Sequence, residues 1–222
     1  MAGTYHIAGP GKIVPSADEW FPHINWVNPP EEREAARNLD LQLLMLRHQE
    51  TQFLSALELL YHVGGTIAFM KTSGLPEHEL GERARVARWT NIAGTYAAIS
   101  LSNFRDALFS IRHAVGQCPT RKVKVDTETL DVMPARFLEA FPNHKELRDG
   151  AVHFVDKIFS TEKIDANRAT DAPFIHGAMD GDTLVFTVEG KHVGLDVTLE
   201  TLEKIAALRR EALECFRKLS VR

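Results

Sequence analysis

An arginine and a histidine near residue 150 are the residues of this sequence best suited to chemistry. Arg148 and His153 are five positions apart, and Asp149 directly follows the arginine. An arginine offers a planar, permanently charged fork to a phosphate, and a histidine with an ordinary pKa of about 6.5 can give and take a proton near neutral pH. Together they predict phosphodiester chemistry without a metal ion. The same spacing is also common on the solvated face of a helix, and this alternative stays open.

The signals around these residues predict a helix. Asn143 follows a proline and can cap a new helix, and Glu146 completes a capping-box pattern three residues later. We therefore expect a helix over residues 144–159.

On such a helix the two side chains do not point the same way. Each residue turns about 100°, so Arg148 and His153 lie about 140° apart. Asp149 and His153, at positions i and i+4, are neighbours, so the carboxylate either orients the imidazole or forms a surface pair. A joint site needs a kink, a long reach of the arginine or a second copy of the helix, which a symmetric dimer would supply.

The elements before this helix are mostly helical in pattern. Apolar residues recur every three or four positions over residues 31–73, which predicts one long helix or two consecutive helices. A second helical region is expected over residues 77–115, packed antiparallel to the first. Gly64 and Gly65 indicate a kink or a close helix contact in the first region. Five small residues in the second region predict that a neighbouring backbone comes close: Ala93, Gly94, Ala97, Ala98 and Ser100.

Residues 117–131 break the helical pattern and contain a basic cluster of Arg121, Lys122 and Lys124. We interpret the cluster as a solvated loop, with RNA contact as the alternative. Pro134 is expected to open a short helix that ends near residue 140.

The spacing of apolar residues changes from a helical to a strand pattern near the C-terminus. Alternating apolar residues and tight-turn signals over residues 173–197 predict a three-stranded antiparallel meander. Thr198 caps a last helix with an apolar face. The predicted fold class is therefore mainly α, a helical bundle over residues 31–222 with a small β-meander inserted before the C-terminal helix. Prolines and glycines over residues 1–30 predict an extended N-terminal arm that packs on this body.

Composition narrows the function. The net charge of −4 argues against a protein that coats nucleic acid, so any RNA contact must be local. Neither a signal peptide nor a membrane span is recognised, and we expect a cytoplasmic protein. Cys118 and Cys215 are expected to be packing residues.

Ten histidines invite a metal hypothesis, but none has the spacing of metal ligands, so we expect no metal and no cofactor. His62 is interpreted as a hydrogen-bonded core histidine. His176 and His192, on predicted strands, are interpreted as cross-strand neighbours.

A late helix carrying an arginine, a polar residue, three further residues and a histidine resembles the HEPN superfamily, whose motif is arginine, four to six residues, then histidine. Arg148, Asp149 and His153 match this motif. The layout of long helices before the motif, a small strand insertion and a closing helix is similar to stand-alone bacterial members of the superfamily.

The resemblance implies a homodimer that brings two motifs into one cleft and a metal-independent endoribonuclease of toxin or defence type, with an antitoxin or other regulatory protein as a partner. Arg148 would bind the scissile phosphate, His153 would assist proton transfer around the ribose 2′-hydroxyl, and Asp149 would orient the site. The alternative is a non-catalytic HEPN-like binding or dimerisation module. That alternative predicts that a structural carboxylate pairs with Arg148.

Overall fold

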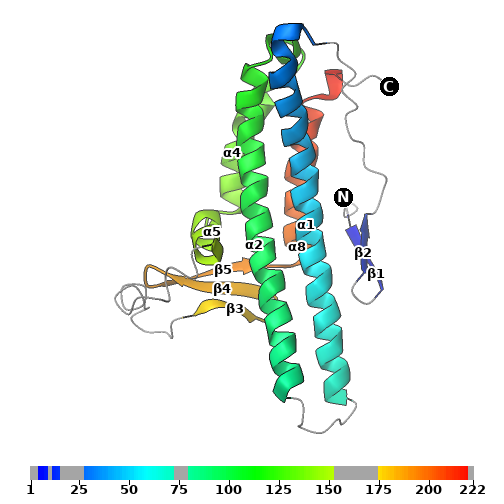
Figure 1. Ribbon diagram of the computed structural model, residues 1–222, viewed down its shortest axis with the longest axis vertical. Helices are drawn as coiled ribbons and strands as arrows, with labels where there is room; N and C mark the ends of the chain where they lie inside the picture. Colours follow the sequence, from blue (N-terminus) through cyan, green and yellow to red (C-terminus); the bar gives the residue numbers. More distant parts are fainter. Residues whose placement is uncertain (1–4, 10–11, 16–27, 73–79, 153–174, 220–222) are drawn as a thin grey trace.

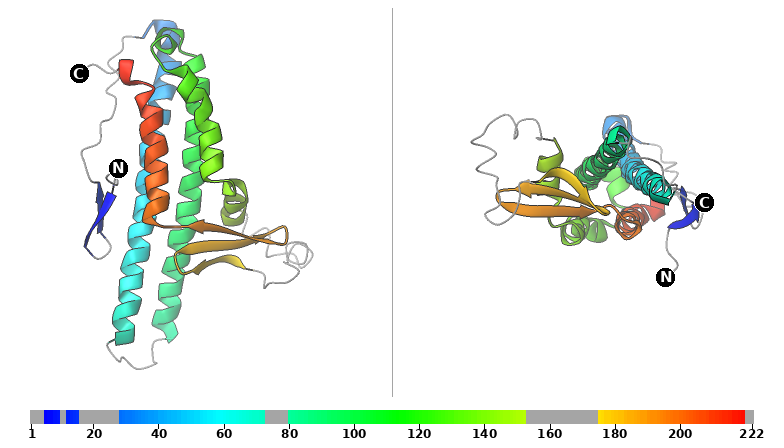
Figure 2. Two further views of the ribbon diagram at one scale, coloured as in Figure 1. Left: turned by 180° about the vertical axis from the view of Figure 1, so that it is seen from behind. Right: turned by 90° about the horizontal axis from the view of Figure 1, so that it is seen from below.

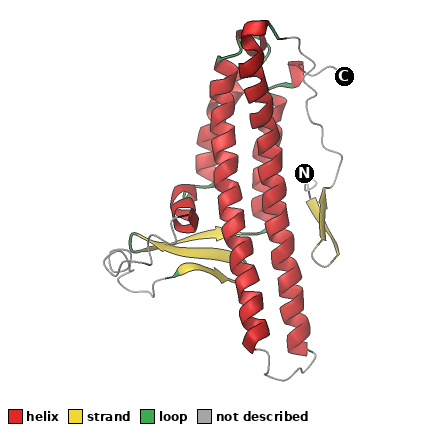
Figure 3. Cartoon of the chain, viewed as in Figure 1, coloured by secondary structure: helices red, strands yellow, loops and turns green. Residues whose placement is uncertain are grey.

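A computed structural model describes residues 5–9, 12–15, 28–72, 80–152 and 175–219. The chain is mainly helical, with a small antiparallel sheet directly before the last long helix (Figures 1 and 3). This confirms the predicted fold class. The division into an arm at 1–30 and a body at 31–222 stays a prediction.

Two long antiparallel helices form the axis of the molecule. A 3-10 turn at Pro30–Glu32 leads into α1 (Arg33–Thr72), and α2 (Leu80–Gly116) returns beside it (Figure 1). Each fully buried leucine between them contributes about 1.5–3 kcal/mol of transfer free energy. The core along this pair includes Leu39, Leu43, Leu46, Phe53 and Leu57 of α1 and Ala97, Leu101, Phe104, Leu108 and Ile111 of α2.

The glycines of these helices have different surroundings. Gly64 and Gly65 lie within α1, and a Cβ at either would meet no atom within 4 Å, so of the two predicted alternatives, a kink or a close helix contact, the close contact is wrong. Gly94 of α2 does mark a close approach. A Cβ there would lie 2.5 Å from Sδ of Met179 and 3.0 Å from Cδ1 of Leu184, so the neighbour is the sheet.

The region after α2 is more helical than predicted. Helix α4 (Thr127–Ala140) begins seven residues before Pro134, because the Asp126 side chain accepts a hydrogen bond of 3.1 Å from the Thr129 amide and caps the helix. Proline inside a helix costs about 3 kcal/mol. The apolar face of α4 offsets that cost through its buried residues Leu130, Met133 and Phe137.

The basic cluster is only partly solvated. It lies at the short helix α3 (Pro119–Lys122), and Lys122 and Lys124 are exposed, but Arg121 is only 1% exposed. Its guanidinium donates to Asp40 at 2.7 Å and to Asn28 at 2.8 Å. The solvated-loop interpretation is therefore wrong for Arg121, which ties α3 to the start of α1.

The sheet is a meander of β3 (His176–Asp180), β4 (Thr183–Val188) and β5 (Lys191–Asp196), each antiparallel to the next. Glu189 and Gly190 both have positive φ, 50° and 75°, which suits the two-residue turn between β4 and β5. The sheet projects from the side of the bundle beside α2 and α5 (Figure 2). This confirms the predicted meander and its packing against the helices.

The last long helix, α8 (Leu199–Glu214), begins where predicted. The Thr198 side chain accepts from the Thr201 amide at 3.3 Å, and a short 3-10 turn, η3 (Arg217–Leu219), follows the helix. The predicted apolar face is buried against the bundle through Leu202, Ile205, Leu208, Leu213 and Phe216.

Two histidine interpretations are wrong. His62 is exposed, because Leu60 and Val63 occupy the buried face of α1 at that point. In the sheet, His176 pairs with Phe186 and His192 pairs with Thr187. Strands β3 and β5 lie on opposite sides of β4, so these two histidines are not cross-strand partners of each other.

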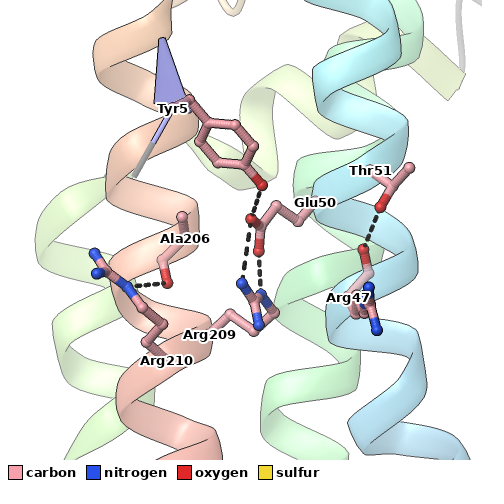
Figure 4. Close-up of polar contacts among 7 residues, drawn as sticks. All are labelled: Tyr5, Arg47, Glu50, Thr51, Ala206, Arg209 and Arg210. Carbon is pink, nitrogen blue, oxygen red and sulfur yellow. Dashed lines mark hydrogen bonds and ion pairs between the residues drawn. The ribbon is translucent and has the colours of Figure 1, made fainter. Parts of the chain in front are cut away.

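Within the N-terminal arm the chain forms a hairpin, β1 (Tyr5–Gly9) and β2 (Lys12–Pro15), which the sequence did not predict. Tyr5 is buried and anchors the hairpin on the body. Its amide donates to Glu203 of α8 at 2.7 Å, and its hydroxyl donates to Glu50 of α1 (Figure 4). Among the described residues of the arm, Tyr5 therefore ties the hairpin to both α1 and α8.

Glu50 also pairs with Arg209 of α8, and the two side chains are 2% and 1% exposed (Figure 4). A buried ion pair is costly to break, because the remaining charge would be left in the core.

No described helix is long and apolar enough to cross a membrane.

Candidate functional site

Helix α5 (His144–Val152) carries the two described members of the predicted motif, Arg148 and Asp149. It begins at the predicted position, and the Leu147 amide donates to the Asn143 carbonyl at 3.0 Å. His153 lies outside the described residues, as does the rest of the helix predicted over 144–159.

The predicted capping box is not formed. Within the described part of the chain, neither the Asn143 side chain nor the Glu146 side chain makes a capping hydrogen bond, and Oε2 of Glu146 is buried with no partner there. His144 Nδ1 instead lies 3.1 Å from the Phe141 carbonyl. A buried acceptor without a donor costs about 1–3 kcal/mol, so Glu146 is an unusual residue two positions before Arg148.

Glycines fix α5 against the sheet. A Cβ at Gly150 would lie 2.7 Å from Cγ of Phe186, so only glycine allows the helix to approach β4 so closely. Gly177 of β3, with φ of +65°, touches the same ring, and its Cβ would lie 2.9 Å from Cε1 of Phe186. The Phe186 ring therefore sets the distance between α5 and the sheet, and with it the position of Arg148.

Arg148 is exposed, and no residue in the described ranges forms an ion pair with it. Asp149 is half-buried. By helical spacing, Arg148 shares a surface with Ala151 and Val152, at positions i+3 and i+4. The binding-module alternative predicts a structural carboxylate on Arg148, and the described residues supply none.

A cavity of about 450 Å³ lies beside this surface, between α2, α5 and the sheet. Its apolar lining includes Ile92, Ile99 and Ala151, with the Phe186 ring among them. The polar contributions of α2 come from Asn91, Thr95 and Tyr96. Sequence analysis did not identify these residues as a site; the available signal was their recurrence every three or four positions on one helix.

The polar groups of the cavity are only partly used. The backbone amide of Met179 donates to Oδ1 of the Asn91 side chain at 3.3 Å. The side-chain NH₂ group of Asn91 keeps two N–H donors that have no partner among the described residues. The Thr95 hydroxyl likewise has no hydrogen-bond partner in the described segments. Hydrogen-bonding capacity therefore remains at the cavity wall.

The cysteines offer no nucleophile near this site. Both are free and buried, which confirms their predicted packing role. Burial raises the pKa of Cys215 to about 11 and also raises the pKa of Cys118. Neither thiol is ionised near neutral pH.

A search of the described residues finds no cluster of three or more side chains that could hold a metal ion. Comparison of the chain with protein-family models, curated proteins and solved structures finds no match. The described residues of the site supply an exposed arginine, an adjacent carboxylate and a cavity with an apolar wall.

Proposed function

We propose that this protein is a metal-independent endoribonuclease of the HEPN-like toxin or defence type, acting as a homodimer in the cytoplasm. The observation that carries the proposal is that Arg148 is exposed and has no ion pair with any described residue. An arginine free of structural partners can bind a phosphate without loss of a fold contact.

The proposed reaction uses the ribose 2′-hydroxyl as the nucleophile. His153 accepts the hydroxyl proton while the 2′-oxygen attacks phosphorus, and the second histidine of the dimer protonates the leaving 5′-oxygen as the P–O bond breaks. Arg148 stabilises the added negative charge on the phosphate. Asp149, at i−4 from His153, holds the imidazole in orientation.

The dimer is proposed from the spacing of the motif in the sequence. On the regular helix that the sequence predicts over residues 144–159, positions 148 and 153 are about 140° apart, so the arginine of one copy and the histidine of the other can face one phosphate. Two exposed apolar residues support a contact between copies: Ile92 of α2, which lines the same cavity as Gly150, and Val152 of α5. An antitoxin or other regulatory protein would act by covering the same surface.

The test is cleavage of a labelled single-stranded RNA by purified protein with a chelator present. Wild type and Lys145→Ala, a matched control that removes another exposed cation from α5, should cleave equally. Arg148→Ala and His153→Ala should each lose about 100-fold or more, the usual loss for a group that transfers a proton or stabilises charge.

Sedimentation in the same buffer reports the oligomeric state. Equal cleavage by all four proteins would show a contaminating nuclease, and no cleavage by any would contradict the enzyme proposal. A dimer that cleaves nothing would instead support the non-catalytic binding module.

A further inference from the structure

We propose that the cavity between α2, α5 and the sheet binds one unstacked base of a single-stranded RNA. The inference rests on the proposed function for its substrate class, and it adds a base-binding subsite to the phosphate site at Arg148. The occupant is a planar ring with a polar edge.

The cavity is placed to take a base from a nucleotide whose phosphate lies at Arg148. Gly150 and Ala151 line the cavity and lie two and three residues after Arg148 along α5. Ala151 lies about 4.5 Å further along the helix axis, on the face it shares with Arg148. One ribose separates a base from its phosphate, so both contacts can come from a single nucleotide.

The apolar lining suits a flat ring. The volume of about 450 Å³ lies within the range of about 300–1,000 Å³ typical of small-molecule sites, with room for one nucleoside. Phe186 and Ile99 line the cavity together with Tyr96, a 42% exposed residue that supplies an aromatic ring for stacking. Stacking on an aromatic side chain is the usual way in which proteins hold unstacked bases of single strands.

The polar wall favours a base over an aliphatic side chain from another protein. The two N–H groups of Asn91 and the Thr95 hydroxyl are one helical turn apart and have no partner among the described residues. A base offers carbonyl oxygens and ring nitrogens to such donors. An aliphatic group would remove the donors from water and leave them unpaired, which is unfavourable.

The charge distribution agrees with one local contact. The net charge of −4 gives no general attraction to RNA, so affinity must come from stacking, hydrogen bonds and the few cations at the site. Each phosphate contact in a single strand adds about −0.7 to the slope of log K against log salt. A base contact should change the affinity and leave this slope unchanged.

The experiment measures binding of a short fluorescent 2′-O-methyl RNA, which cannot be cleaved through its 2′-oxygen, by anisotropy at several salt concentrations. Tyr96→Leu keeps an apolar side chain and removes the ring, and it should weaken binding at least about fivefold with an unchanged salt slope. Tyr96→Phe should bind like the wild type. Thr95→Val, of the same shape, should also weaken binding.

Two control variants make the result specific. Trp89→Leu removes an exposed aromatic of α2 that does not line the cavity, and it should bind like the wild type. Arg148→Ala should reduce the salt slope by about 0.7. Urea unfolding of each variant separates lost binding from lost folding, and Thr95→Val tests the cavity wall if Tyr96→Leu unfolds.

Three results would overturn the base site: no RNA binding by the wild type, equal binding by Tyr96→Leu, or an equal loss in Trp89→Leu. Binding of an apolar peptide in place of RNA would also overturn it. A different result would contradict the nuclease alone: the wild-type protein binds a cleavable RNA, Tyr96→Leu weakens that binding, and the RNA still stays intact.

Discussion

Three arginines of this chain have different environments, and these decide what each can do. Arg121 and Arg209 are each 1% exposed and are held by Asp40 and Glu50, so they are structural. Arg148 is exposed and has no ion pair in the described part of the chain, so it remains available to a ligand. Separating a buried arginine from its carboxylate would leave an unpaired charge in the core, which costs about 3–5 kcal/mol of stability.

The Glu50–Arg209 pair gives a direct test at the residue scale. Arg209→Met should lower the free energy of unfolding by about 3–5 kcal/mol, because Glu50 would remain charged in the core. Adding Glu50→Leu to that variant should recover part of the loss, since no buried charge remains although the Tyr5 hydroxyl loses its acceptor. Equilibrium urea unfolding measures both variants, and a double variant as unstable as the single one would contradict this account.

Glu146 gives a second test at this scale. Because Oε2 of Glu146 is buried without a partner among the described residues, Glu146→Met should raise the free energy of unfolding by about 1–3 kcal/mol. The measurement is again urea unfolding, with Lys145→Met as the exposed neighbour that should change little. A loss of stability in Glu146→Met would mean that the carboxylate has a partner.

At the scale of elements, the contact between α5 and β4 sets the geometry of the site. The helix approaches the sheet where it has a glycine, and the Phe186 ring fills the space that a side chain would otherwise take. The sheet thus acts as a support for the helix that carries Arg148. This contact joins segments 36 residues apart in sequence, from Gly150 to Phe186.

Two glycine-to-alanine changes should have opposite effects. Gly150→Ala places a Cβ 2.7 Å from the Phe186 ring and should lower the free energy of unfolding by about 1–3 kcal/mol. Gly65→Ala, in α1 with open space around it, should raise it by about 0.5–1 kcal/mol, the helix preference of alanine over glycine. Thermal unfolding of the two variants compares them, and equal shifts would mean that α5 does not pack on Phe186 in this way.

At the scale of the whole molecule, buried acids link stability to pH. Burial raises the pKa of Cys215 from 9.0 to about 11, with a further contribution from the charge of Asp126. Burial also raises the pKa of Cys118 and of Tyr61. Each group ionises in the unfolded chain before it ionises in the folded one.

The contribution of Cys215 to the free energy of unfolding should therefore be constant up to about pH 9 and should fall as pH rises from there through about 11. Urea unfolding at pH 7 to 10.5 measures this, with Cys215→Ala as the comparison. The variant should be less stable at pH 7 because of the lost packing, yet its stability should fall less steeply above pH 9. The same steepness in both proteins would show that Cys215 does not contribute.

The sequence by itself determined the helical class, the meander and its turns, and the beginnings of α5 and α8, because apolar period, turn residues and caps act within a few positions. It also supplied the motif residues Arg148 and Asp149 as hypotheses. It did not distinguish the buried Arg121 from an exposed lysine, and it placed the start of α4 at Pro134 because a proline is a stronger local signal than the cap at Asp126.

Only the tertiary structure decided which polar residues are paired and where a cavity lies. The Tyr5 anchor, the Glu50–Arg209 pair and the cavity beside Gly150 each join segments far apart in the chain. The burial and the partners of a side chain depend on which distant segments pack against it. The residues next to it in the sequence do not predict those segments. For this reason residue types supplied only a hypothesis about chemistry, whereas the exposure of Arg148 and the cavity beside α5 came from packing.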